Sequence, residues 1–256
     1  MTNIEAAQTA HKTVWMVSGN KGGVGKSLFC LALASALEAR EEHFAILDGD
    51  GRTSDVYATF LRKCPALSAD FRELRPESNN CSRDAEYEGF FYQLLSASPN
   101  LIINTPDGAD ALLMKWFDKT LSFAETLNYQ FKFMYLMSER PDGLEILPEL
   151  ASKFAFFYPI RNLHFGEPGL FTFFNRNYAR IFHEILDFPV LRSEELRMLF
   201  DVKTYPNEAL NLKDDYGNYT IPTLSRSRIQ TWQVTVTDAL DNIIDNKIEP
   251  NTLKIN

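Results

Sequence analysis

The segment of residues 20–27 (NKGGVGKS) constrains the fold of this chain more than any other feature. It follows an apolar run, residues 13–18 (TVWMVS), which predicts a short buried strand. It precedes LFCLALASALEAR, a run of strong helix formers that predicts a helix. The glycines allow backbone N–H groups to turn inward, and the positive end of the helix points at the same place. A strand, a glycine-rich loop and a helix in this order predict a phosphate-binding loop.

The general form of such a loop is G-x-x-x-x-G-K-[ST], and only its first position differs here, where Asn20 replaces glycine. Lys26 is expected to reach the β- and γ-phosphates, and the Ser27 hydroxyl to ligate Mg²⁺. The expected cofactors are therefore ATP or ADP with Mg²⁺. The simpler alternative is a glycine-rich turn before a helix. The residues expected to bind the nucleotide here are Gly22, Gly23, Val24, Gly25, Lys26, Ser27 and Leu28.

Strands and helices alternate along the rest of the chain. Further strands are predicted at residues 43–47, 71–74 (short), 100–103, 131–137 and 169–174. Helices are predicted at residues 54–63 and 86–96, and from about residues 109 and 142. The aromatic stretch at residues 154–159 (FAFFYP) is interpreted as core. This alternation predicts an α/β fold with a mostly parallel sheet flanked by helices, in a P-loop NTPase architecture.

Polar clusters directly follow four of the predicted strands: GNKGGVGKS, DGDGRTSD, NTPDG and NRN. Ligands of parallel sheets bind beyond the carboxyl ends of the strands. All four clusters are therefore expected to meet at one edge of the sheet. Asp48 and Asp50 alternate on an extended chain, so both carboxylates are expected to face one metal or water. The alternative is a polar strand end followed by a helix N-cap at Ser54 or Asp55.

The second loop lysine, Lys21, completes KGGVGKS, which resembles the deviant Walker A motif of the ParA/MinD family of ATPases. The resemblance covers residues 13–60 and 99–108, and the second half only by layout. It implies that Lys21 reaches across a nucleotide-sandwich homodimer to the partner's phosphates. It also implies that Asp50 orients the attacking water and that Asp48 supports the Mg²⁺ shell. The catalytic residues expected on this basis are Asp50, Lys26 and Lys21. The D-x-D followed by TSD and the divergent second half look more like the StbB- and TraL-like branch, of plasmid stability and conjugative transfer, than the cell-division branch.

Two further positions matter to that resemblance. Where the family usually has an aspartate in DTP, this chain has Asn104 in NTP. An asparagine keeps an acceptor oxygen and loses the charge, so a weaker metal contact and slow hydrolysis are expected. The alternative to slow hydrolysis is that Asp107 or Asp48 compensates, and Asn104→Asp should raise turnover or leave it unchanged. Asn175 and Arg176, after the predicted strand at residues 169–174, match the family's adenine-binding N-R pair, with a plain turn as the alternative.

Composition limits the remaining choices. The 256 residues suit a single P-loop ATPase domain, 1–256, with a polar leader at 1–12 and a C-terminal amphipathic helix at about 225–246. The three cysteines lack a CxxC spacing, which favours a reducing, cytoplasmic setting. A net charge of −8 does not support DNA as a partner, although DNA stays open. The C-terminal helix lacks the basic face of a membrane anchor.

Three functions follow from these observations. The first is an ATP-driven dimerisation switch with slow hydrolysis that positions or partitions plasmid DNA or a protein complex, through a protein adaptor or cargo. The second is a nucleotide-binding scaffold that does not turn over, and Asn104 separates it from the first. The third, a P-loop enzyme acting on a small substrate, is disfavoured because Lys21 implies a dimer-facing loop.

Overall fold

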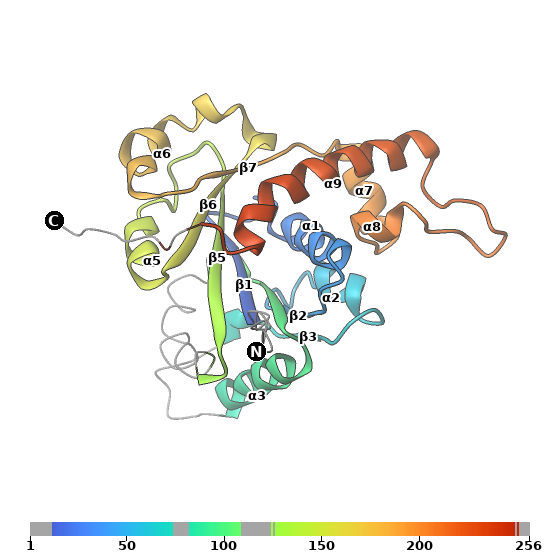
Figure 1. Ribbon diagram of the computed structural model, residues 1–256, viewed down its shortest axis with the longest axis horizontal. Coiled ribbons are helices and arrows are strands. Elements are labelled where there is room, and N and C mark those ends of the chain that lie inside the picture. Colours follow the sequence, from blue (N-terminus) through green and yellow to red (C-terminus); the bar gives the residue numbers. More distant parts are fainter. Residues whose placement is uncertain (1–11, 74–81, 109–123, 125, 249, 251–256) are drawn as a thin grey trace, which may run out of the picture.

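The computed structural model of the protein describes residues 12–73, 82–108, 124, 126–248 and 250. Seven strands form one sheet in the order β3-β2-β4-β1-β5-β6-β7, and every neighbouring pair is parallel (Figure 1). The predicted α/β class and parallel sheet are confirmed. The strands are β1 (Lys12–Gly19), β2 (Phe44–Asp48), β3 (Ala66–Ser68), β4 (Asn100–Asn104), β5 (Tyr129–Met137), β6 (Phe156–Asn162) and β7 (Leu186–Phe188). The helix expected from about residue 109 lies outside the described residues.

The central strands are buried on both faces, which explains why they are continuous apolar runs instead of alternating patterns. Their register aligns the polar strand ends. Asn104, the last residue of β4, pairs in register with Val17 of β1 and with Asp48, the last residue of β2. The segments that follow these three strands therefore start side by side at one edge of the sheet.

Helices cover both faces of the sheet (Figure 1). One face carries α1 (Lys26–Ala39), α2 (Asp55–Phe60), α7 (Ser193–Asp201), α8 (Pro206–Ala209) and α9 (Thr223–Ile244). The other face carries α3 (Ser82–Ala97), α5 (Leu147–Lys153) and α6 (Thr172–Asn177). Within the described part of the chain, no helix is long and apolar enough to cross a membrane.

The C-terminal helix was predicted from the spacing of six apolar residues, and the structure confirms it. All six side chains are buried against α1 and the sheet: Ile229, Trp232, Val236, Leu240, Ile243 and Ile244. Lys132, in the middle of β5, is also fully buried on this side. Its ammonium group donates to the backbone carbonyl of Ile243 in the last turn of α9 and lies 4.4 Å from the centre of the Trp15 ring. A buried lysine thus caps the end of α9.

Two predicted strands are wrong. The segment at residues 71–74 begins a 3-10 helix, Phe71–Glu73, and the strand lies earlier, at β3. The segment at residues 169–174 forms the 3-10 helix Pro168–Leu170 and the start of α6. Its buried aromatics, Phe171 and Phe174, are three residues apart, which is a helical spacing. The helix expected from about residue 142 begins later, at α5.

A strand that the sequence did not predict, β6, begins inside the aromatic stretch at residues 154–159 and continues to Asn162. The sequence pattern indicated only that this stretch belongs to the core. Phe157, Tyr158 and Ile160 are buried, so the core assignment is confirmed. The strand reading was missed because a short apolar run, buried on both faces, has no period-2 signal. The consequence for the site is that Asn162, at the end of β6, lies at the ligand edge of the sheet.

Candidate functional site

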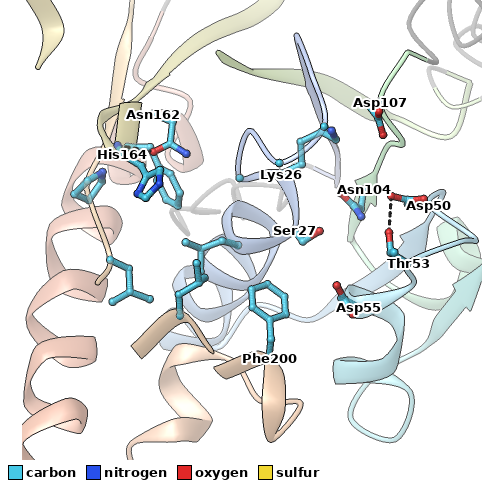
Figure 2. A pocket seen from close by; sticks show the side chains of 18 residues that line it. Lys26, Ser27, Asp50, Thr53, Asp55, Asn104, Asp107, Asn162, His164 and Phe200 are labelled. Atoms are coloured by element: carbon cyan, nitrogen blue, oxygen red, sulfur yellow. Dashed lines mark hydrogen bonds between the residues drawn. The ribbon is translucent and has the colours of Figure 1, made fainter. Parts of the chain in front are cut away.

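A cavity of about 280 Å³ opens at the carboxyl ends of the central strands, where the phosphate-loop prediction placed it. Figure 2 shows Asp50, Asn104 and Asp107 on one side of Lys26, and Asn162 and His164 on the other. Three of the four predicted polar clusters therefore meet here. The lining residues are Gly22, Gly23, Gly25, Lys26, Ser27, Leu28, Asp50, Thr53, Asp55, Asn104, Asp107, Asn162, His164, Phe188, Pro189, Leu191, Leu196 and Phe200.

The loop between β1 and α1 has the backbone that its glycines predict. Gly23 and Gly25 have φ angles of 72° and 101°, in the left-handed region that favours glycine. Gly25 is also the N-cap of α1, whose free N–H groups therefore point at the cavity. Lys26 is 8% exposed, and its Nζ donates to the backbone carbonyl of Lys21 at 3.3 Å. Ser27 lines the cavity at the first turn of α1. This arrangement provides inward donors and a positive charge for an anion.

Asn20, the residue in place of the first glycine, ties the loop to the chain that follows β5. Its Nδ2 donates to the carbonyl of Asp142 at 2.9 Å, and its Oδ1 accepts from the N–H of Ser138 at 3.3 Å. The N–H of Asn20 donates to the carbonyl of Leu136 at 3.1 Å. The departure from glycine therefore gives the loop a side-chain anchor.

Asn162 supports the loop from the opposite side, and sequence reasoning missed it. Its Nδ2 donates to the carbonyl of Val24 at 2.8 Å, and its Oδ1 accepts from the N–H of His164 at 3.0 Å. The side chain is 6% exposed and lies against Gly25. If β6 is recognised as a strand, Asn162 is its last residue. A polar amide at the carboxyl end of a parallel strand is then a candidate for the ligand edge of the sheet.

Asn175 and Arg176 do not lie where the sequence placed them. They are on α6 instead of following a strand, and neither lines the cavity. Asn175 Oδ1 accepts from Arg161 at 3.2 Å, and its Nδ2 donates to the carbonyl of Pro168 at 2.8 Å. The geometry behind the expected adenine contact is therefore wrong, because the preceding segment is helical.

Asp50 is held at the cavity by two donors. Its Oδ2 accepts from the Thr53 hydroxyl at 2.9 Å, and its Oδ1 accepts from a guanidinium nitrogen of Arg72 at 2.6 Å. Asp107 lies against the phosphate loop, since a Cβ added to Gly22 would be 3.1 Å from its Oδ2. Both carboxylates lie on the same side of Lys26 (Figure 2).

Asp48 does not face the cavity together with Asp50, so that expectation is wrong. Asp48 is fully buried and is not among the residues that line the cavity, whereas Asp50 is. Burial raises the pKa of its carboxyl, and donors oppose the shift. The donors are the N–H of Tyr57 at 3.0 Å, the amide of Asn104 at 2.9 Å and the N–H of Asp50 at 3.2 Å. Asn104 thus separates Asp48 from the cavity.

A divalent cation fits this site only with a ligand's help. Within the described ranges, no group of three His, Cys, Asp or Glu side chains is arranged to hold a metal. Mg²⁺ usually keeps several waters and takes oxygens from substrate phosphates. The side chains of Ser27, Asp50 and Asn104 line the same cavity, and this polar set suits a Mg²⁺ that arrives with phosphates. The residues present are therefore compatible with a nucleotide-borne metal.

The other side of the cavity is apolar. It is built by the end of β7, the segment that follows it and the inner side of α7: Phe188, Pro189, Leu191, Leu196 and Phe200. Lys21 lies at the rim, with its Nζ 4.6 Å from the centre of the Phe165 ring. An anion-binding loop next to an apolar wall suits a ligand with a polyanionic head and a flat apolar body.

Comparison with known sequences finds a distant relative. Protein MobD of Acidithiobacillus ferrooxidans is 24% identical over 175 residues, which cover 66% of this chain and 71% of MobD. No family model matches the chain.

Comparison with solved structures finds the same fold in several proteins. A nucleotide-binding protein of Archaeoglobus fulgidus in complex with ADP superposes with a TM-score of 0.54 and 15% identity, over 75% of this chain and 86% of that one. A ParA family ATPase of Chlorobium tepidum superposes with a TM-score of 0.53 and 11% identity, over 88% of this chain and 99% of that one. A plasmid partition protein of Borrelia burgdorferi superposes with a TM-score of 0.54 and 14% identity, over 92% of this chain and 99% of that one. The chain thus has the fold of ParA-like P-loop proteins, as its loop predicts.

Proposed function

We propose that this chain is an ATP-binding dimerisation switch with slow Mg²⁺-dependent hydrolysis, which positions or partitions plasmid DNA or a protein complex. One observation carries the proposal: a single cavity joins the phosphate loop, the carboxylates after β2 and β4, and an apolar wall. Separate structural roles for these segments would not require them to converge. The fold shared with a ParA family ATPase and a plasmid partition protein supports the same reading.

The phosphates would bind to the loop between β1 and α1. Lys26 is buried at the cavity, so its charge acts on a bound phosphate with little screening by water. One of its partners, the carbonyl of Lys21, is a neutral acceptor, and a phosphate oxygen would offer Lys26 a charged acceptor instead. Ser27 would hold Mg²⁺, whose chemistry is to neutralise charge on the transferred phosphoryl group.

The nucleoside would lie on the apolar side. Pro189 and Leu191 offer flat contacts to a base, and Asn162 still has one N–H and one acceptor site beyond its two hydrogen bonds. In this proposal Asn162 takes the place first assigned to Asn175. Its contact with Val24 would also connect the base side of the cavity to the phosphate loop.

Hydrolysis would use Asp50 to orient the attacking water, because it lines the cavity together with Lys26 and Ser27. Asn104 lines the same cavity with a neutral side chain, which supports slow turnover. The non-hydrolysing scaffold remains the second candidate because of this residue. Lys21, which is half-buried at the rim, would cross to the partner's phosphates in an ATP-bound homodimer.

Two variants test the proposal together. Calorimetry with ATP and Mg²⁺ should show binding by wild type and a loss of roughly tenfold to a hundredfold in Lys26→Ala, since charge-assisted hydrogen bonds contribute about 1.5–3 kcal/mol. Single-turnover hydrolysis should be slow in wild type and absent in Asp50→Ala, with binding retained. Lys247→Ala, which removes a surface lysine paired with Asp245, is the control for charge. Wild-type affinity in Lys26→Ala would overturn the nucleotide assignment. Binding without any turnover in wild type would select the scaffold.

A further inference from the structure

Arg72 contacts Asp50 from outside the cavity lining. Its guanidinium is 2.6 Å from Asp50 Oδ1 and 2.8 Å from Asp70 Oδ1, so it bridges two carboxylates. Hydrogen bonding to Asp70 and then to Asp50 raises the pKa of the Arg72 guanidinium, opposed by partial burial, so the bridge stays charged. Arg72 belongs to none of the polar clusters that follow the predicted strands.

The backbone holds Arg72 in place for this contact. The chain after β3 is hydrogen-bonded to the end of β2 and the residue that follows it. The N–H of Ala69 donates to the backbone carbonyl of Asp48 at 2.9 Å, and the N–H of Phe71 donates to the backbone carbonyl of Gly49 at 3.0 Å. Asp50 and Asp70 also form an antiparallel bridge. Phe71 is fully buried and anchors the short helix that carries Arg72. The guanidinium therefore approaches Asp50 from a rigid support.

The two donors to Asp50 set the orientation of its carboxylate. Arg72 binds one oxygen and Thr53 binds the other, so rotation of the carboxylate would break both contacts. A carboxylate has about four acceptor sites, and two therefore remain for water. A group that orients a nucleophile is effective only if its own direction is fixed, and a misplacement of about 1 Å can cost about a hundredfold in rate.

We propose that Arg72 is a positioning residue that fixes the Asp50 carboxylate for the water-orienting step, together with Thr53. This inference rests on the proposed ATP hydrolysis. It adds a second layer to the site, built from the chain after β3. Arg52 is a matched control, because it is an arginine of the same cluster that approaches Asp70 at 4.0 Å and has a largely exposed side chain.

The first measurement is single-turnover hydrolysis of bound ATP and Mg²⁺. Arg72→Met should lower the rate by about tenfold to a hundredfold, with the dissociation constant for ATP within about twofold of wild type. Arg72→Lys keeps the charge and should recover part of the rate, whereas Arg52→Met should leave it unchanged. A purely structural role would weaken binding together with turnover. Equal rates in Arg72→Met and Arg52→Met would overturn the proposal.

The second measurement does not depend on turnover. Hydrogen exchange of amides in residues 49–54 should be faster in Arg72→Met than in Arg52→Met, because the Asp50–Thr53 turn loses its external contact. If wild type binds ATP without hydrolysing it, the proposed hydrolysis fails, and exchange still decides the role of Arg72. Equal exchange in the two variants would show that Arg72 does not hold Asp50.

Discussion

The side-chain amide of Asn104 donates a 2.9 Å hydrogen bond to the buried carboxylate of Asp48, across the ends of two neighbouring strands. Asn104 Oδ1 lies 3.9 Å from the Cys30 thiol. The amide nitrogen thus supplies the donor that a fully buried carboxylate needs. An ionised aspartate at position 104 would have no N–H to donate. Asparagine in place of the aspartate of the DTP pattern therefore suits the buried carboxylate of Asp48, which accepts from it.

This contact reverses the expectation for Asn104→Asp. Two carboxyl groups at hydrogen-bond distance in a buried site cannot both ionise, so one would hold a proton that an unfolded chain releases near pH 4. Because the folded state then binds more protons, its stability falls as pH rises above about 4. We expect a loss that grows by about 1.4 kcal/mol per pH unit above pH 4, to roughly 1.4 kcal/mol at pH 5 and at most about 4 kcal/mol at pH 7. Turnover should not increase.

Urea unfolding of wild type and Asn104→Asp at pH 5 and pH 7 measures this. Asn104→Ser, which removes the amide without adding charge, controls for the lost hydrogen bond and should show a difference from wild type that varies little with pH. A stability of Asn104→Asp equal to wild type at pH 7 would contradict the expected repulsion.

Lys21 should be needed for an ATP-dependent homodimer. Its ammonium now lies over the Phe165 ring of its own chain, a contact of about 0.5–1 kcal/mol at an exposed site, and must leave it to reach a partner. Lys21→Ala should therefore weaken ATP-dependent dimerisation by about tenfold or more. Phe165→Leu should strengthen it by roughly twofold to fivefold, because the resting contact is lost.

Light scattering of the three proteins with a non-hydrolysable ATP analogue and Mg²⁺ tests this, with ADP as the control. The idea fails if wild type stays monomeric with the analogue, or if Lys21→Ala dimerises as well as wild type does.

Lys132 should make stability depend on pH through the capping of α9. Burial lowers the pKa of its ammonium to about 7, from an ordinary value of 10.5, and nearby Glu42 opposes this shift while Arg40 reinforces it. Between pH 7 and 10.5 the unfolded chain therefore binds more protons at this site. The free energy of unfolding therefore rises with pH between 7 and 10.5 on account of Lys132, by at most about 1.4 kcal/mol per pH unit. This gain is lost again as the pH falls back to 7.

Lys132→Met keeps the length and apolar stem of the side chain and removes the titration. Urea titration measures the free energy of unfolding of both proteins. Between pH 7 and pH 9, this free energy should rise more in wild type than in Lys132→Met. Parallel pH dependences would show that Lys132 does not titrate in this window.

Much of the site follows from local sequence. Lys26 and Ser27 lie at the cavity and at the start of α1 because this loop is a local motif, in which glycine conformations and the helix start depend on adjacent residues. The amphipathic spacing of α9 was likewise local, and each of its six marked residues is buried. Asp50 and Asn104 were brought to the cavity because parallel strands align their carboxyl ends.

Contacts between distant segments decided the rest. Asn162 was missed because the burial of β6 on both faces depends on its neighbouring strands and helices, which local spacing does not report. Asp48 stays in the interior because Asn104 and the backbone of Tyr57, on other segments, donate to its carboxylate, whereas Asp50 lines the cavity. Arg72 reaches Asp50 across 22 positions. Local patterns specify the glycine-rich loop, its helix start and the α/β class of the fold, because each depends on residues close together in the chain. The side chains that hold the loop and Asp50 in place come from segments far apart in the chain, so only the folded arrangement reveals them.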